Sequence, residues 1–188
     1  MTYKVVPLSK DNKEDLFRLF EENSYVHQRE WKSCYCRFYH TSCTMHHWMS
    51  KSAESNKTEA IEAIDAQKMH GFLAYDQDRC IGWLNAGSIL SYPRIHKSII
   101  PEYLNDRVAL TICYVVADDF IGKKVASALL DTAIETLKTK EFEMMMAIPV
   151  ENPINEKSYR GFKQMYLNRG YIEEKVTSEL SYFILKLR

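Results

Sequence analysis

The spacing of hydrophobic positions in the first third of the chain predicts a strand and two helices. An apolar run over residues 3–8 predicts the strand. The following stripe predicts an amphipathic helix whose inward face is Leu16, Phe17, Leu19 and Phe20. Residues 24–50 show no regular period and are rich in aromatic, cysteine and histidine side chains. A second helical stripe covers residues 56–71, and we expect Gly71 to end it.

The middle of the chain predicts a hairpin followed by a buried strand. Two β-rich runs, residues 71–75 and 80–89, flank a short turn of polar residues. The run from Val108 to Val116 is apolar at every position except two. Such a pattern is typical of a strand that is covered on both faces of a sheet.

Five further elements follow and complete the predicted order. They are a helix over about residues 122–140, a strand at 143–150, a short helix at 158–170, and an antiparallel pair at 171–176 and 178–187. The order β-α-α-β-β-β-α-β-α-β-β is α/β in the broad sense, with a mixed sheet and helices on both faces. The length suits one domain, so we expect residues 1–188 to form a single domain.

Composition and charge narrow the class of protein. The chain is 46% hydrophobic and 12% aromatic, as expected of a globular protein. Its 25 basic and 25 acidic side chains balance, which lowers the expectation of a nucleic-acid partner. No apolar run approaches the ~20 residues of a membrane span, and five cysteines without an export signal indicate reduced thiols. We therefore expect a cytoplasmic protein without a membrane or nucleic-acid partner.

The stretch VVADDFIGKKVASALL, Val115 to Leu130, predicts a strand end, a tight turn and a helix start. Backbone N–H groups at a helix start lack intrahelical partners and suit a phosphate group. Gly122 and Ala126 are small enough to let a phosphate approach the backbone. Lys124 carries a Cβ into that space, although its ammonium can pair with a phosphate. The alternative interpretation is a plain packing corner.

The element order and this corner resemble the GNAT superfamily of acetyl-CoA-dependent acyltransferases. The superfamily hallmark is a strand ending Val-x-Pro, followed by Arg/Gln-x-x-Gly-x-Gly/Ala at the helix start. Val116 and Ala126 match its ends, and Gly122 falls where many members carry an additional glycine. Three positions differ, because Asp118 replaces the proline, Ile121 the Arg/Gln and Lys124 the central glycine.

A second motif agrees with the resemblance. Members often end the helix after the fifth strand with Tyr-x-x-x-Gly-Phe, and this chain has YLNRGY from Tyr166 to Tyr171. The resemblance implies that Tyr166 is the general acid that protonates the departing thiolate. A phenol of pKa ~10 is protonated at neutral pH and is able to donate. The alternative is that Tyr166 is one more aromatic residue of the core.

The resemblance also implies acetyl-CoA as co-substrate. The main chain at the corner would hold the pyrophosphate, through Ile121, Gly122, Lys123, Lys124, Val125 and Ala126. The backbone of the preceding strand would guide the pantetheine arm and stabilise the oxyanion, through Tyr114, Val115 and Val116. No general base is evident, although the loop before this strand offers His96, Glu102 and Asp106.

The implied function is direct acetyl transfer to the amine of a small molecule or a protein. The altered corner motivates an alternative, a non-catalytic GNAT-like module that binds coenzyme A or another ligand as a sensor or interaction partner. Many members of the superfamily dimerise, so a homodimer is one assembly that the resemblance implies. The sequence leaves the acceptor and the assembly open.

A cluster of thiols and imidazoles lies in the irregular segment: Cys34, Cys36, His40, Cys43, His46 and His47. These are the ligands that zinc prefers, but the spacing lacks a paired Cys-x2-Cys knuckle. A zinc-binding interaction protein is therefore a third hypothesis. We rank packing around an acceptor pocket first, core packing second and a metal last, so no metal ligand is predicted. Similar Cys-x-Cys stretches with aromatic residues occur in a poorly characterised subset of the superfamily.

Overall fold

The strands of the computed structural model form a seven-stranded sheet in the order β1-β2-β3-β4-β5-β7-β6. The structure describes residues 3–22, 24, 29–149, 159–175 and 181–188. Neighbouring strands run antiparallel except β4 and β5, which are parallel. The strands are β1 Lys4–Pro7, β2 Gly71–Asp76, β3 Arg79–Ser88, β4 Val108–Val116, β5 Met144–Ala147, β6 Ile172–Lys175 and β7 Ser181–Lys186.

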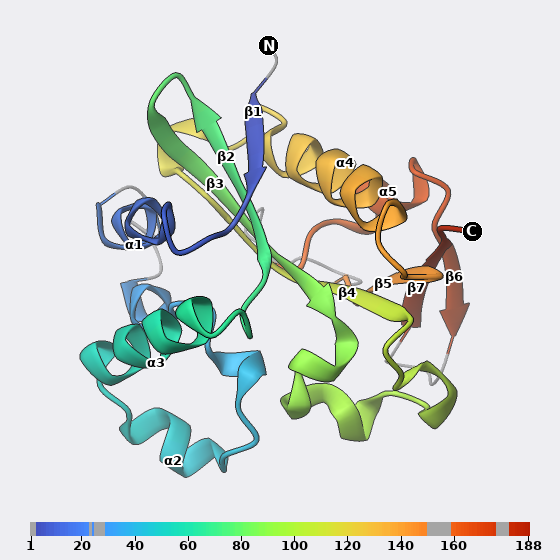
Figure 1. The fold of residues 1–188 in the computed structure, drawn as a ribbon, viewed down its shortest axis with the longest axis horizontal. Coiled ribbons are helices and arrows are strands. Elements are labelled where there is room, and N and C mark those ends of the chain that lie inside the picture. The colour runs from blue at the N-terminus through green and yellow to red at the C-terminus, as the bar shows by residue number, and fades with distance from the viewer. Residues whose placement is uncertain (1–2, 23, 25–28, 150–158, 176–180) are drawn as a thin grey trace.

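Helices cover both faces of this sheet. Figure 1 shows α1 and α3 on one side and α4 and α5 on the other. The α-helices are α1 Lys13–Glu22, α2 Met45–Ser50, α3 Ala53–Asp65, α4 Val125–Lys138 and α5 Lys163–Leu167. Short 3-10 helices lie between them: η1 Arg29–Cys34, η2 Phe38–His40, η3 Ile89–Ser91, η4 Pro93–Ser98, η5 Pro101–Tyr103 and η6 Asp118–Phe120. Within the described ranges, none of the helices has the length and apolar character to cross a membrane.

The predicted fold class is confirmed, with one element added. The irregular segment contains the short helix α2, so three helices precede β2 rather than two. The predicted inward face of α1 is buried, and β4 has the predicted bounds and burial on both faces. The terminal strands pair antiparallel as predicted, and β7 inserts between β5 and β6.

The prediction that Gly71 ends the second helix is wrong. Helix α3 ends at Asp65, and Gln67 rather than a glycine takes the left-handed conformation after it, with φ 53°. Gly71 instead begins β2, where a Cβ would lie 2.1 Å from the Leu84 carbonyl oxygen and 2.2 Å from the Trp83 ring. This glycine is therefore required by close packing in the sheet.

The β4 strand changes its pairing halfway along. It pairs with β5 only from Val108 to Thr111, which faces Ala147 at the end of β5. Its register with β3 shifts between Asn85 and Ala86, because Ile112 is an extra residue on β4. A bulge of this kind bends the strand locally. From Ile112 onward β4 has no β5 neighbour, so the sheet is open on that side.

We expect Gly71→Ala to destabilise the fold by roughly 1–3 kcal/mol, the scale of overpacking in a core. The new methyl group would meet a backbone carbonyl, which cannot yield as a side chain can. Gly87→Ala is the matched control, because its Cβ would meet the His70 side chain at 3.1 Å. Chemical denaturation of both variants checks this, and equal stability would contradict it.

Candidate functional site

The open side of β4 brings together two tyrosines that are far apart in the sequence. Tyr114 lies on β4 beyond the bulge, and Tyr166 lies on α5. Their hydroxyl oxygens are 3.2 Å apart and buried. Helix α5 is held against α4 by Arg169, which forms an ion pair with Asp131 and reaches the Ser127 carbonyl. The site is thus assembled from the sheet and both helices of one face.

The Tyr166 hydroxyl is fully buried and well supplied with partners. It donates to the Arg160 carbonyl at 2.9 Å and lies within hydrogen-bonding reach of Thr111 and Tyr114. Burial raises the pKa of Tyr166 to about 12, while the hydrogen bonds with Tyr114 and Thr111 oppose the increase. The phenol therefore carries its proton at neutral pH, as a general acid requires.

The backbone of β4 beyond the bulge also points a donor into the opening, the Tyr114 N–H. The Tyr114 N–H turns away from β3 and donates to the Tyr159 carbonyl at 2.6 Å. Val115 is buried and Val116 half-buried, so their side chains pack while their main chain follows the strand toward the corner. Tyr114, Val115 and Val116 thus form a continuous edge from Tyr166 to the start of α4.

At the corner, two residues adopt left-handed backbone conformations. Gly122 has φ 78°, and Lys124 has φ 65° and ψ 18°. Lys124 is the N-cap residue of α4, yet its side chain makes no capping hydrogen bond. The first N–H groups of α4 therefore face outward without an intrahelical partner. The corner has a glycine-like conformation at Lys124 although the residue is a lysine.

Two residues from outside the turn, Arg79 and Tyr3, contact the residues just before α4. Arg79 forms a bidentate ion pair with Asp119 at 2.7 and 2.9 Å, and its guanidinium lies over the Phe120 ring. The Lys123 ammonium also lies over Phe120, at 4.8 Å from the ring centre. The Tyr3 hydroxyl donates to the Lys123 carbonyl at 3.0 Å. These contacts link the turn to β3 and to the residue before β1, and the Lys123 ammonium lies over the aromatic ring.

The six predicted pyrophosphate residues divide into two groups by their side chains. Ile121 is 45% exposed, and Gly122, Lys123 and Lys124 are exposed beside it. Val125 is 1% exposed and belongs to the core, so only its N–H group is available. Ala126 is half-buried. A Cβ at Gly122 would meet nothing within 4 Å, so the space above the turn is open. The corner fits an anion bound by main-chain N–H groups.

These observations can be compared with known proteins. Residues 14–166 match the model of the Acetyltransferase (GNAT) family. The chain belongs to this family. Membership supports the predicted acyl transfer and the use of acetyl-CoA as acyl donor. Among curated proteins no match is found.

The GNAT fold is also found in solved structures that resemble the whole chain. Aminoglycoside acetyltransferase AAC(6′)-Ib in complex with coenzyme A is 13% identical, with TM-score 0.64, covering 98% of this chain and 95% of that one. The PaiA N-acetyltransferase from Thermoplasma acidophilum, also with coenzyme A, is 16% identical, with TM-score 0.54 and 99% coverage of each chain. An N-acetyltransferase from Staphylococcus aureus Mu50 is 12% identical, with TM-score 0.58 and full coverage of both chains.

In this GNAT protein the cysteine and histidine cluster contacts β3 and β4. The Cys36 thiol accepts from the Trp83 indole N–H at 3.1 Å and lies 3.2 Å from the Cys113 sulfur. His40 and Asn85 are 3.0 Å apart, and Asn85 accepts from the Tyr92 hydroxyl. The cluster therefore joins the segment before α2 to the sheet.

The protonation states of this cluster are those of buried neutral groups. Burial raises the pKa of Cys34 to about 12 and keeps the Cys36 thiol protonated. Burial likewise lowers the pKa of His40 to about 4. His46 and His47 are exposed on α2. In the part of the chain that the structure describes, no three histidine, cysteine or carboxylate side chains are grouped to hold a metal.

The three loop residues considered as a general base lie away from Tyr114. Glu102 is in η5 and Asp106 follows it, so both precede the start of β4. Val108 and Tyr114 are six residues apart along the strand, which is about 20 Å. The His96 ring contacts the Ile89 carbonyl at 3.2 Å. None of the three is brought to the opening of the sheet.

Two participants at the opening were not predicted from the sequence. The Thr111 side chain forms a hydrogen bond with the Tyr166 hydroxyl, and the Tyr159 carbonyl accepts a hydrogen bond from the Tyr114 N–H. Thr111 stands out as a polar residue in an apolar strand, and this was a signal in the sequence. A backbone carbonyl such as that of Tyr159 leaves no such signal.

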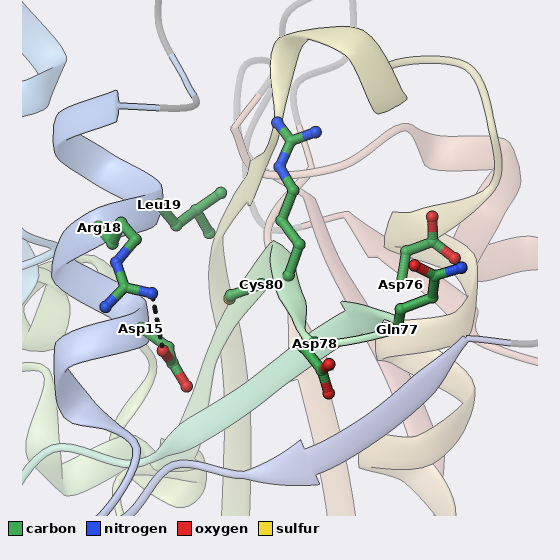
Figure 2. Close-up of a pocket in the computed structure, with 8 residues that line it drawn as sticks. Asp15, Arg18, Leu19, Asp76, Gln77, Asp78 and Cys80 are labelled. Carbon is green, nitrogen blue, oxygen red and sulfur yellow. Dashed lines mark ion pairs between the residues drawn. The ribbon is translucent and has the colours of Figure 1, made fainter.

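A pocket of about 370 Å³ lies elsewhere, between α1 and the β2–β3 turn. Figure 2 shows Asp15, Arg18 and Leu19 projecting from α1 toward Asp76, Gln77, Asp78 and Cys80 of the hairpin, with Arg79 also lining the pocket. Arg18 pairs with Asp15, and Arg79 turns to Asp119. The lining contains none of the predicted site residues, so we assign this pocket no role in acyl transfer.

We expect acid to destabilise the protein as pH falls from about 6.5 to 4. His40 is neutral when folded, with a pKa of about 4 against an ordinary value of 6.5. The unfolded chain thus binds more protons in this window, and stability decreases as pH falls through it. His70 contributes in the same direction, because burial also lowers its pKa.

His40→Gln keeps an acceptor for Asn85 but cannot titrate, so its melting temperature should fall less between pH 7 and 4.5 than that of the wild type. His46→Gln, an exposed control on α2, should keep the full loss. Thermal melts across this range provide the measurement. Parallel curves for His40→Gln and wild type would show that His40 is not responsible.

Proposed function

We propose that the protein is an acetyl-CoA-dependent N-acetyltransferase that transfers acetyl directly to an amine of a small molecule or protein. One observation carries the proposal: the hydroxyl oxygens of Tyr114 and Tyr166 lie 3.2 Å apart where the sheet opens beside β4. The same edge leads to a corner with outward N–H groups at the start of α4. Family membership supports the acyl donor, and the arrangement supports a general acid beside it.

In the proposed reaction, each group has a defined task. The main chain of Tyr114, Val115 and Val116 aligns the pantetheine arm, and the Tyr114 N–H stabilises negative charge on the thioester oxygen. An amine attacks the thioester carbonyl carbon, and the carbon–sulfur bond breaks. Tyr166 then gives its proton to the coenzyme A sulfur. The attacking amine loses its proton to water.

The corner would hold the pyrophosphate through main-chain groups from Ile121 to Ala126. The left-handed conformation of Lys124 supports this, because it orients the first N–H groups as a glycine would. Lys124 is exposed, so its ammonium can reach a phosphate. Lys123 contributes only its backbone, because its ammonium lies over Phe120.

A non-catalytic module that binds coenzyme A remains the second candidate. This candidate is favoured by the Tyr159 carbonyl, which already accepts the hydrogen bond of the Tyr114 N–H.

We further propose one domain over residues 1–188, because one sheet includes strands near both ends of the chain. Free thiols at all five cysteines support a reducing compartment such as the cytoplasm. The acceptor amine and a homodimer are not specified by these observations.

Calorimetric titration with acetyl-CoA, followed by a panel of amines assayed for thiol release, tests the proposal. Binding together with turnover of at least one amine is the expected result. Binding without turnover of any amine or of water would favour the non-catalytic module. Failure to bind coenzyme A in any form would overturn both candidates.

We predict opposite effects of Lys124→Gly on stability and binding. Glycine adopts a left-handed φ without the roughly 1–2 kcal/mol penalty of an L residue, so the melting temperature should rise. Loss of the ammonium should weaken acetyl-CoA binding at low salt, with a smaller loss at high salt because exposed charges are screened. Lys124→Ala, which keeps the Cβ, should show the binding loss without the gain in stability. Much tighter binding by Lys124→Gly at every salt concentration would identify the lysine as a steric block.

Tyr166→Phe should slow the chemical step by roughly 10²-fold or more, the usual scale for removing a positioned acid. The ring remains, so the fold persists, with a loss of about 1 kcal/mol for the hydrogen bond to Arg160. Single-turnover rates at saturating acetyl-CoA, beside separately measured dissociation constants, provide the test.

Tyr171→Phe is the matched control. Its ring packs edge-on against Tyr166, and its buried hydroxyl has no hydrogen-bond partner in the described structure. It should keep the wild-type rate. A full-rate Tyr166→Phe enzyme on a confirmed acceptor would remove Tyr166 from the mechanism.

A further inference from the structure

Both hydrogen-bond donors of the proposed reaction are bound by the chain itself. The Tyr114 N–H donates to the Tyr159 carbonyl at 2.6 Å. The Tyr166 hydroxyl donates to the Arg160 carbonyl at 2.9 Å. The two acceptors are consecutive residues, so one short piece of backbone holds both donors.

These contacts exclude the thioester from the same position. A backbone N–H has one hydrogen, and so has a phenol, so neither can serve a second acceptor fully. The Tyr159 carbonyl stands where the thioester oxygen would accept from Tyr114. The Arg160 carbonyl stands where the sulfur would receive the proton of Tyr166. The segment therefore imitates the hydrogen-bonding pattern of the acyl group.

Specific features keep the segment in this position. Gly161 has φ 78°, and a Cβ there would lie only 3.0 Å from the Tyr166 hydroxyl, so a glycine permits the close approach. The Tyr159 ring packs edge-on against Trp31, with ring centres 5.1 Å apart. Its hydroxyl lies 3.1 Å from that of Tyr39. Tyr159 thus contacts β4 through its backbone and the segment before α2 through its side chain.

We propose that Tyr159 and Arg160 hold the acyl site closed and that acetyl-CoA binds productively only when it displaces them. The inference rests on the proposed function, since it assumes that Tyr114 and Tyr166 serve the thioester. If the open state is a fraction f of the population, the apparent dissociation constant is the intrinsic one divided by f. Weakening the closed contact therefore tightens acetyl-CoA binding.

Displacement also changes the surroundings of an acceptor. When the Tyr159 backbone leaves β4, its ring leaves Trp31 and Tyr39, which lie in the segment before α2. Entry of acetyl-CoA thus uncovers two aromatic side chains beside the reacting centre.

The test compares two probes on Tyr159→Ala by calorimetric titration. Acetyl-CoA reaches the acyl site, whereas 3′-phosphoadenosine 5′-diphosphate contains the nucleotide part of coenzyme A and stops at the corner. Tyr159→Ala loses an aromatic pair and a hydroxyl contact, so acetyl-CoA should bind about tenfold more tightly. The affinity for the nucleotide should be unchanged, because the corner lies outside the contact.

Tyr39→Phe is a milder variant that removes only the hydroxyl contact with Tyr159, and it should tighten acetyl-CoA binding by a few fold. Tyr103→Phe is the matched control, because its hydroxyl binds Glu174 away from the site, and both affinities should stay at the wild-type values. Hydrogen exchange at the Tyr114 amide gives a second readout, with faster exchange expected in Tyr159→Ala.

Unchanged or weaker acetyl-CoA binding by Tyr159→Ala, with nucleotide binding intact, would overturn the closed-site inference and leave the proposed function standing. Binding of neither probe by the wild type would overturn the proposed function, and the inference with it. Equal exchange of the Tyr114 amide in wild type and Tyr159→Ala would contradict the closed contact independently of any ligand.

Discussion

The parallel pairing of β4 with β5 stops after Thr111 and Ala147, and the arrangement of the site depends on this break. Beyond it, the backbone groups of β4 that would face β5 need other partners, because buried N–H groups are rarely left unpaired. The bulge at Ile112 bends the strand at the same point. Helix α5 then places Tyr166 at the opening, and a short piece of chain satisfies the Tyr114 N–H. The proposed acyl site and its proposed blockage thus both depend on one interruption of the sheet.

At the start of α4, a lysine adopts a left-handed backbone conformation that a glycine adopts more readily. Lys124 has the left-handed φ that a glycine adopts without cost, although a lysine pays a steric penalty there. Just before the turn, Arg79 pairs with Asp119 and its guanidinium lies over the Phe120 ring. A strained residue held by its neighbours is typical of functional sites. This strain is the structural observation behind the proposal that the corner belongs to the binding site.

The sequence predicted the elements whose hydrophobic pattern follows from which of their faces is buried. It did not predict features that depend on close contacts between backbone atoms. The stripe of α1 and the apolar run of β4 follow from one buried helix face and two buried sheet faces, so their patterns are legible. The end of α3 was wrong because Gln67 rather than a glycine turns the chain. The corner and Tyr166 were predicted as site residues through motif resemblance, and that prediction stays a proposal. The Tyr159 contact joins backbone atoms 45 residues apart, and no side-chain pattern encodes such a bond.

The titratable side chains around the opening share one property, because each is buried in its neutral form. Burial keeps Tyr166, Tyr114 and Cys36 protonated, and it keeps the His40 imidazole in its neutral form. Each of these side chains is therefore neutral at pH 7, yet each has a hydrogen-bond partner in the structure. A charged lining would have to be desolvated whenever a substrate entered, at a large cost. Neutral donors avoid that cost and still act on charge that develops during reaction, because hydrogen bonds are stronger in a region of low dielectric. Cys36 and His40 are thus accounted for by contacts with buried polar groups of β3 and β4, whereas His46 and His47 are exposed on α2.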